Sequence, residues 1–323
     1  MTVESISETR ATPLGAPGAE VARRRRGRPR QWRTHLFGLG LVAPALLLYC
    51  GFVVYPLVRG AIVSFFQWTG LSTTMSWVGW SNYVNAVHDP IFLLSLRNTI
   101  EYAVVVTIAK NVLGLGLALI LNRAIRFRTF FRTATFLPVL ISFVVCGILW
   151  SWIFSTVFGL ADHFLQILGF HHFPGWLSDP HIALWSVMWV DVWKWTGFHT
   201  VLFLAALQAV PKELYDAADV DGASAWHRLR YVTLPSIRPV IALSTMLALT
   251  GAFVANYTLV TVMTHGGPLN ATQVALTYIV NTAFSANEVG YANAMSMILF
   301  VVVAVVGAVQ LRLMVRRSEV QRG

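Results

Sequence analysis

Beyond residue 35, long apolar stretches alternate with shorter polar connections along the chain. A helix needs about 20 predominantly apolar residues to cross the roughly 30 Å hydrocarbon core of a bilayer. Six stretches reach this length, and each predicts a membrane-spanning helix. The predicted spans are Leu36–Val58, Tyr102–Asn122, Thr133–Phe154, Ile182–Val210, Pro239–Met263 and Tyr291–Leu311. The pattern therefore predicts an all-α polytopic membrane protein with a six-helix domain over residues 35–315.

The composition agrees with this pattern. Of the 323 residues, 56% are hydrophobic and 12% are charged, whereas soluble domains carry about 25% charged residues. The two cysteines, Cys50 and Cys146, lie inside apolar stretches, so we expect small packing side chains rather than a disulfide. Four histidines around the second outer loop are expected to be solvated rather than to bind a metal. These are His163, His171, His172 and His181.

The positive charge follows the predicted topology. Of the 24 Lys and Arg residues, 20 lie before the first span, between spans two and three, between spans four and five, or after the last span. The positive-inside rule places these segments and both termini in the cytoplasm. We therefore expect a disordered basic cytoplasmic tail over residues 1–34, a cytoplasmic tail over residues 316–323, and a location in the plasma (bacterial inner) membrane.

A run of arginines directly precedes the first predicted span. Within it, Arg26-Gly27-Arg28-Pro29 is similar to a hook that binds the minor groove of DNA. A charge cluster that abuts a membrane helix and contacts anionic lipids explains the same residues. We favour the lipid bilayer as the partner and expect no nucleic acid. The run has no apolar region of the kind found in cleaved signal peptides.

The connection between spans four and five predicts a short amphipathic helix. Pro211 suits the first turn of a helix, and acidic side chains follow at its favourable N-terminal end. Leu214, Ala217 and Ala218 share one face, and Gly222 then ends or bends the helix. An apolar helix face outside the membrane needs a groove on a protein partner to cover it. The alternative is a helix that lies on the membrane surface.

A second break is expected at Leu234-Pro235, and with it the connection resembles the EAA loop of ABC-importer permeases. That pattern is Glu-Ala-Ala, three further positions, Gly, and a later Leu-Pro. In that family the loop is the coupling helix that docks in a cleft of the ATPase subunit. Asp216 stands where Glu is usual and Leu229 where Phe is common, and both changes keep the chemistry. The resemblance assigns the ATPase contact to Asp216, Ala217, Ala218, Asp221, Gly222 and Ala223, and the coupling loop also includes Glu213, Tyr215 and Pro235.

Further segments within residues 36–315 are similar to sugar permeases. They are Leu96–Thr99, Arg128–Arg132 with Leu137-Pro138, Trp176–Pro180 and Thr264–Thr272. The last contains Gly266-Gly267-Pro268 and resembles a loop of the maltose-transporter F-type subunit and its glycerol-phosphate relatives. The chain is thus identified as a member of the carbohydrate-uptake ABC importer permeases, which implies the type I permease fold.

The resemblance implies transport by an assembly of several subunits. It implies a second homologous permease subunit, an ATP-binding-cassette ATPase dimer and an extracytoplasmic solute-binding protein, with a sugar or sugar-like solute moved by alternating access. The sequence has no Gly-x-x-x-x-Gly-Lys-Ser/Thr phosphate loop and no nucleophile–base constellation. We therefore expect no enzyme activity and no cofactor, with ATP hydrolysis on a separate subunit. The alternative is a self-sufficient secondary transporter or channel, which would predict inverted repeats; the two halves show no clear repeat.

Ionisable side chains inside predicted spans are costly and mark functional candidates. Lys110 lies in the middle of span two. In span four, Asp191 and Lys194 are spaced to share a face and to neutralise each other. Lys194, Trp195 and Phe198 would suit a sugar, which has apolar ring faces and hydroxyl groups. An ion pair that only packs helices is the alternative.

Span five contains small and polar residues in an otherwise apolar run. The resemblance implies that spans four and five line the solute path, so this stretch is a second candidate for solute contact. Close helix packing explains small residues equally well. The candidates are Gly251, Ala252, Ala255, Asn256 and Tyr257.

Overall fold

The computed structural model describes residues 42–123, 126–170 and 174–319. The predicted tail over residues 1–34, the beginning of the first predicted span, and the pair His171-His172 lie outside the described residues.

The described chain divides into two compact units, one ending at Pro56 and the other beginning at Leu57. In the first unit, residues 42–49 form an α-helix that becomes a π-helix over Cys50–Val54. With α2 (Tyr55–Val63), these residues make a helix of 22 residues that is long and apolar enough to cross a membrane.

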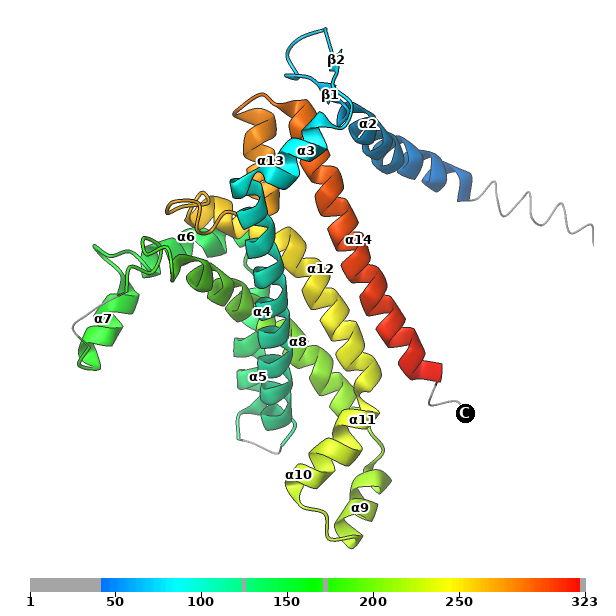
Figure 1. The fold of residues 1–323 in the computed structure, drawn as a ribbon. Helices are drawn as coiled ribbons and strands as arrows, with labels where there is room; N and C mark the ends of the chain where they lie inside the picture. The colour runs from blue at the N-terminus through cyan, green and yellow to red at the C-terminus, as the bar shows by residue number, and fades with distance from the viewer. Residues whose placement is uncertain (1–41, 124–125, 171–173, 320–323) are drawn as a thin grey trace, which may run out of the picture. The chain divides into compact units, whose positions relative to one another are not determined.

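The second unit is built around three long helices that pack on one another, as Figure 1 shows. These are α4 (Pro90–Leu121), α8 (Ala183–Gln208) and α12 (Arg238–Met263). The largest apolar core lies between them and α6 (Phe143–Ile153), and it includes Tyr102. This core is the frame that holds the polar side chains described below.

Among the described residues, four helices are long and apolar enough to cross a membrane. They are Val42–Val63, Pro90–Leu121, Arg238–Met263 and Val289–Arg312, the last being most of α14 (Val289–Glu319). A bent helix pair raises the number to five if it is one span. Predicted spans one, two, five and six therefore correspond to apolar helices, of which α4 begins 12 residues before the predicted start and α14 continues to Glu319.

The predicted third span is present as a bent helix pair rather than as one straight helix. The chain forms α5 (Arg128–Phe136) and a 3-10 turn over Leu137–Leu140, and then α6 starts in a direction 103° away. Proline has no N–H to donate, and Pro138 lies in the turn. Extended backbone at Ile141 and Ser142 completes the break. Hydropathy does not detect such a bend because both sides are apolar.

The predicted fourth span is present as the 26-residue helix α8, but α8 is not among the helices apolar enough to cross a membrane by composition. More than half of its residues are buried, including Asp191, Lys194 and His199. Neighbouring helices therefore cover this helix where lipid would cover an ordinary span.

Shorter elements complete the second unit. A two-residue antiparallel pair joins β1 (Phe66–Gln67) to β2 (Ser76–Trp77), with Phe66 opposite Trp77. The short helices are α3 (Ser81–His88), α7 (Leu160–Ile167), α9 (Lys212–Val220), α10 (Ala225–His227), α11 (Leu234–Ser236) and α13 (Ala275–Phe284). Figure 1 shows α3 and α13 at the end of this unit opposite α9 and α10.

Asp89 holds together the end of the unit that contains α3 and α13. Its carboxylate caps α4 by accepting bonds from the amides of Ile91 and Phe92. It also accepts bonds from the hydroxyls of Tyr278 at 2.7 Å and Tyr291 at 2.9 Å. Burial alone would raise the pKa of Asp89, but these four hydrogen bonds hold it below its ordinary value.

Two of the segments that resemble sugar permeases meet at this end. The Asn98 side chain donates bonds to the carbonyls of Ala271 (3.0 Å) and Gln273 (2.9 Å). The hydroxyl of Thr99 accepts a bond from the amide of Ala275. The loop is closed internally by Thr272, whose hydroxyl donates to the Gly267 carbonyl at 2.6 Å. The segment around Asn98 therefore holds the Gly-Gly-Pro loop against α4.

Candidate functional site

The connection between α8 and α12 forms a compact helical segment outside the long helices. The predicted short helix is confirmed as α9, which starts after Pro211 and carries Glu213 in its first turn. Gly222 follows its C-terminus with φ of +69°, a left-handed conformation that glycine adopts without steric cost. Ser224 then caps α10 by accepting a bond from the amide of His227.

The second half of the connection is a π-helix over Arg228–Thr233 that is tied back to α9. The hydroxyls of Tyr215 and Thr233 lie 3.1 Å apart, and Arg228 forms an ion pair with Asp219. The chain breaks at Ile237, where α12 is about to begin, rather than at the predicted Leu234-Pro235. The loop is therefore one folded segment.

This segment leaves apolar side chains uncovered. Val220 is 88% exposed and Trp226 is 64% exposed. The acidic and small positions Glu213, Asp216, Ala217, Asp221 and Gly222 are also exposed, whereas Tyr215, Ala218, Ala223 and Pro235 are half-buried. Apolar surface of this kind beside small residues is typical of a protein-docking face. The structure thus brings the predicted coupling residues together on one segment.

A buried polar cluster lies between α4 and α8. Lys110 and Asp191 form an ion pair of 2.9 Å, and their side chains are 2% and 0% exposed. The Tyr102 hydroxyl donates to the other Asp191 oxygen at 3.2 Å. The predicted pairing of Asp191 with Lys194 is wrong because both carboxylate oxygens are occupied by side chains from α4. Lys110 and Asp191 are 81 residues apart in the sequence. A rule based on the spacing of residues within one helix therefore could not predict this contact.

Lys194 points instead to the bend in the predicted third span. Its Nζ donates to the Val139 carbonyl at 3.0 Å and lies 4.8 Å from the centre of the Phe143 ring and 5.2 Å from that of Trp195. A cation over aromatic rings is attracted to their faces. The ring of Phe198 packs edge-on against Trp195 at 5.5 Å.

Three predicted solute-path residues of α8, namely Lys194, Trp195 and Phe198, therefore lie together. Phe143 joins this group from α6, and it could not be predicted from the sequence because its position depends on the bend. Another link, between His199 of α8 and Ser244 of α12 at 2.7 Å, was also missed.

The predicted solute-path residues of α12 are buried or partly buried. Ala252, Ala255 and Asn256 are buried, whereas Gly251 and Tyr257 are partly buried. Asn256 is 1% exposed, and neither its amide nitrogen nor its oxygen has a hydrogen-bond partner within the described chain. A buried polar group without a partner costs about 1–3 kcal/mol. A polar ligand would remove this cost, which marks Asn256 as the strongest candidate on α12.

Within the described residues no cluster of His, Cys, Asp and Glu is suited to hold a metal ion. The candidate sites are therefore the exposed connection and the interior of the α4–α8–α12 frame.

Comparison with known proteins finds a family of transport components and several permeases among the relatives of this chain. Residues 110–319 match the family described as binding-protein-dependent transport system inner membrane component. The probable ABC transporter permease YurN of Bacillus subtilis is 32% identical over 274 residues, covering 84% of this chain and 93% of YurN. The lactose transport permease LacF of Rhizobium radiobacter is 34% identical and covers 83% and 91%. The diacetylchitobiose uptake permease NgcF of Streptomyces coelicolor is 32% identical and covers 90% and 89%.

The fold has a counterpart among solved structures. A bacterial ABC transporter that imports the acidic polysaccharide alginate has a chain with a TM-score of 0.76 and 21% identity, covering 89% of this chain and 99% of that one. The predicted type I permease fold and the resemblance to carbohydrate-uptake permeases are confirmed. The chain is a multi-pass membrane protein and a permease subunit rather than an ATPase. It belongs to the family of binding-protein-dependent transport system inner membrane components.

Proposed function

We propose that this chain is the membrane-spanning subunit of an ATP-driven importer that moves a sugar or sugar-like solute into the cytoplasm. The observation that carries this proposal is the folded connection of residues 211–237, which presents uncovered apolar and small side chains outside the long helices. The sugar assignment is supported by the names of relatives such as LacF and NgcF, which refer to lactose and diacetylchitobiose.

In this proposal the connection is the coupling segment that docks in the ATPase. Val220 and Trp226 supply apolar contact area, and the small side chains of Ala217 and Gly222 allow a groove wall to approach the backbone. Asp216 and Asp221 supply charge at the rim. ATP binding closes the ATPase dimer, moves this segment and changes the side from which the solute path is open.

The assembly contains more than this chain. A second homologous permease subunit encloses the path, two ATPase subunits bind at the coupling segment, and a solute-binding protein delivers the solute on the other side. Both termini, including the tails of residues 1–34 and 316–323, lie in the cytoplasm, as the distribution of Lys and Arg favours. Residues 35–315 form the membrane domain.

The solute path runs beside α8 and α12. Trp195 and Phe198 provide aromatic faces for a sugar ring, and Lys194 and Asn256 provide hydrogen-bond donors. Tyr257 adds a hydroxyl, and the small residues Gly251, Ala252 and Ala255 leave room for the solute on α12. The unpartnered amide of Asn256 supports this placement because a sugar hydroxyl would satisfy it.

A matched pair of glycine substitutions tests the coupling role. Gly222 and Gly169 both have a left-handed φ, and a Cβ at either position would meet no atom within 4 Å. Gly222→Trp and Gly169→Trp therefore carry similar backbone strain of about 1–2 kcal/mol. In the importer reconstituted with its ATPase and binding protein, Gly222→Trp is expected to abolish uptake while membrane insertion stays normal. Gly169→Trp is expected to keep uptake.

Coupled uptake by Gly222→Trp at the level of Gly169→Trp would contradict the docking role. Uptake by the chain alone, without an ATPase, would instead support a self-sufficient secondary transporter and refute the proposed function.

A further inference from the structure

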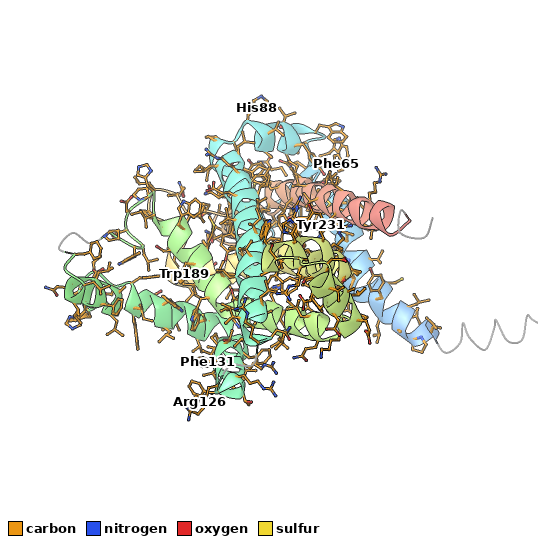
Figure 2. All side chains as sticks on the ribbon, turned by 90° about the horizontal axis from the view of Figure 1, so that it is seen from below. Phe65, His88, Arg126, Phe131, Trp189 and Tyr231 are labelled. Atoms are coloured by element: carbon orange, nitrogen blue, oxygen red, sulfur yellow. The ribbon has the colours of Figure 1, made fainter. Side chains whose placement is uncertain are left out.

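The segment that leads from the end of α4 into α5 carries a surface to which the proposed function assigns no role. This basic–aromatic face consists of Arg126, Phe127, Arg128, Phe130, Phe131 and Leu137, all of which are exposed. Phe127 is 70% and Phe130 is 67% exposed. Figure 2 shows Arg126 and Phe131 near each other at the edge of the ribbon formed by α5.

The charge of this face is not neutralised within the described chain. The sequence contains no Asp or Glu between Glu101 and Asp162. The ion pairs that Lys110 forms with Asp191 and Arg228 with Asp219 lie elsewhere. The guanidinium of Arg126 lies 5.6 Å from the centre of the Phe127 ring. Because this ring has no net charge, the charge of Arg126 remains available to an anion.

The local backbone fixes this face at the end of a membrane helix. Phe127 adopts φ of +64°, and this left-handed residue starts α5 without a side-chain cap on its first amides. The Nη2 of Arg132 donates to the Leu121 carbonyl at the C-terminus of α4, and its buried Nε has no partner in the described part of the chain. Because α4 is apolar enough to cross a membrane, the face follows one end of a candidate membrane span, which is where a chain meets lipid headgroups.

We infer that this face binds an anionic phospholipid. Its occupant must supply both negative charge for the arginines and apolar surface for the phenylalanine rings. A phosphodiester headgroup with its acyl chains meets both needs, whereas inorganic phosphate would leave the rings uncovered. Basic residues beside aromatic ones at a membrane helix end are typical of contact with anionic lipid. This inference requires only that the chain is embedded in a membrane, so it stands apart from the coupling role.

The test compares two pairs of arginines in the purified full-length chain. Arg126→Gln with Arg128→Gln removes two charges from the face. Arg230→Gln with Arg238→Gln removes two exposed charges, one in the coupling segment and one at the first residue of α12. Binding of phosphatidylglycerol and of phosphatidylcholine is measured by native mass spectrometry. We expect the wild type to prefer phosphatidylglycerol, and the first pair to weaken its binding by about thirtyfold. The control pair should bind as the wild type does.

A third variant separates lipid from other anions. Phe130→Ser keeps every charge, and it should still weaken phosphatidylglycerol binding because an apolar contact is lost. If the arginine pair proves unstable, Arg126→Gln alone and Phe130→Ser carry the test, since both side chains are exposed.

Four outcomes would overturn the inference. They are equal weakening by both arginine pairs, the absence of a preference for phosphatidylglycerol in the wild type, displacement of the lipid by millimolar inorganic phosphate, and loss of the preference when the ATPase subunit is bound. The last outcome would assign the face to a protein partner.

Discussion

The buried cluster between α4 and α8 and the exposed connection between α8 and α12 handle charge in opposite ways. In the cluster, Asp191 has a partner for each oxygen and is fully covered. In the connection, Asp219 pairs with Arg228 while both side chains remain open to solvent. The first arrangement is complete within the chain, whereas the second lies beside Val220 and Trp226, which the described residues leave largely uncovered. Structural and partner-dependent polar residues can thus be told apart by what surrounds them.

The largest expected effect tests the two aspartates against each other. Asp191→Ala leaves the buried Lys110 without a counter-charge, and breaking a buried pair in this way costs about 3–5 kcal/mol. Asp219→Ala breaks an exposed pair worth about 0–1 kcal/mol. Thermal unfolding in detergent should show a large loss for the first variant and little change for the second.

Equal thermal stability of the two aspartate variants would contradict this comparison. Replacing Lys110 and Asp191 together with Met and Leu should recover most of the loss, because no charge then remains unpaired.

A smaller effect is expected from two glycines of α4 that are two residues apart. A Cβ at Gly114 would lie 2.8 Å from the Cβ of His199 and 3.2 Å from its backbone, whereas a Cβ at Gly116 would meet nothing within 4 Å. Gly114→Ala should lower the free energy of unfolding by about 1–3 kcal/mol through overpacking against α8. Gly116→Ala should raise it by about 0.5–1 kcal/mol because alanine is the better helix former. Measured in one unfolding assay, the changes in the free energy of unfolding of the two variants should have opposite signs.

The smallest effect on stability is expected in the connection. Val220→Ser changes an exposed side chain, so the midpoint of thermal unfolding should stay within the equivalent of about 0.5 kcal/mol. Its effect should appear in a pull-down of the ATPase subunit, which loses an apolar contact. Exposed Val157 lies in a different loop, and Val157→Ser is the control that should retain the ATPase. A marked drop in stability for Val220→Ser would mean that Val220 is structural.

The sequence was sufficient where the signal is local. Apolar length predicted α4, α12 and α14, and the spacing from Pro211 to Gly222 predicted α9 and its end. These features depend on residues within a few turns of one another, and helix formation follows such local patterns.

The sequence was insufficient where contacts join distant segments. Lys194 and Lys110 compete for Asp191, and only the packing of α4 on α8 decides that Lys110 is its partner. The bend after Pro138 was hidden because apolar residues continue through it. Phe143 could not be connected with Lys194 without that bend. Asn256 was named as polar, but its lack of a partner depends on every helix around it.

The contact between Lys194 and residue 139 has a consequence for sequence change. Lys194 binds the backbone carbonyl of Val139 rather than its side chain, and every amino acid at position 139 would supply the same oxygen. Substitution there can alter size or polarity without removing the acceptor, provided that the bend keeps its shape. Selection on this contact would therefore fall on Lys194 and on the residues that form the bend, while position 139 stays free to vary.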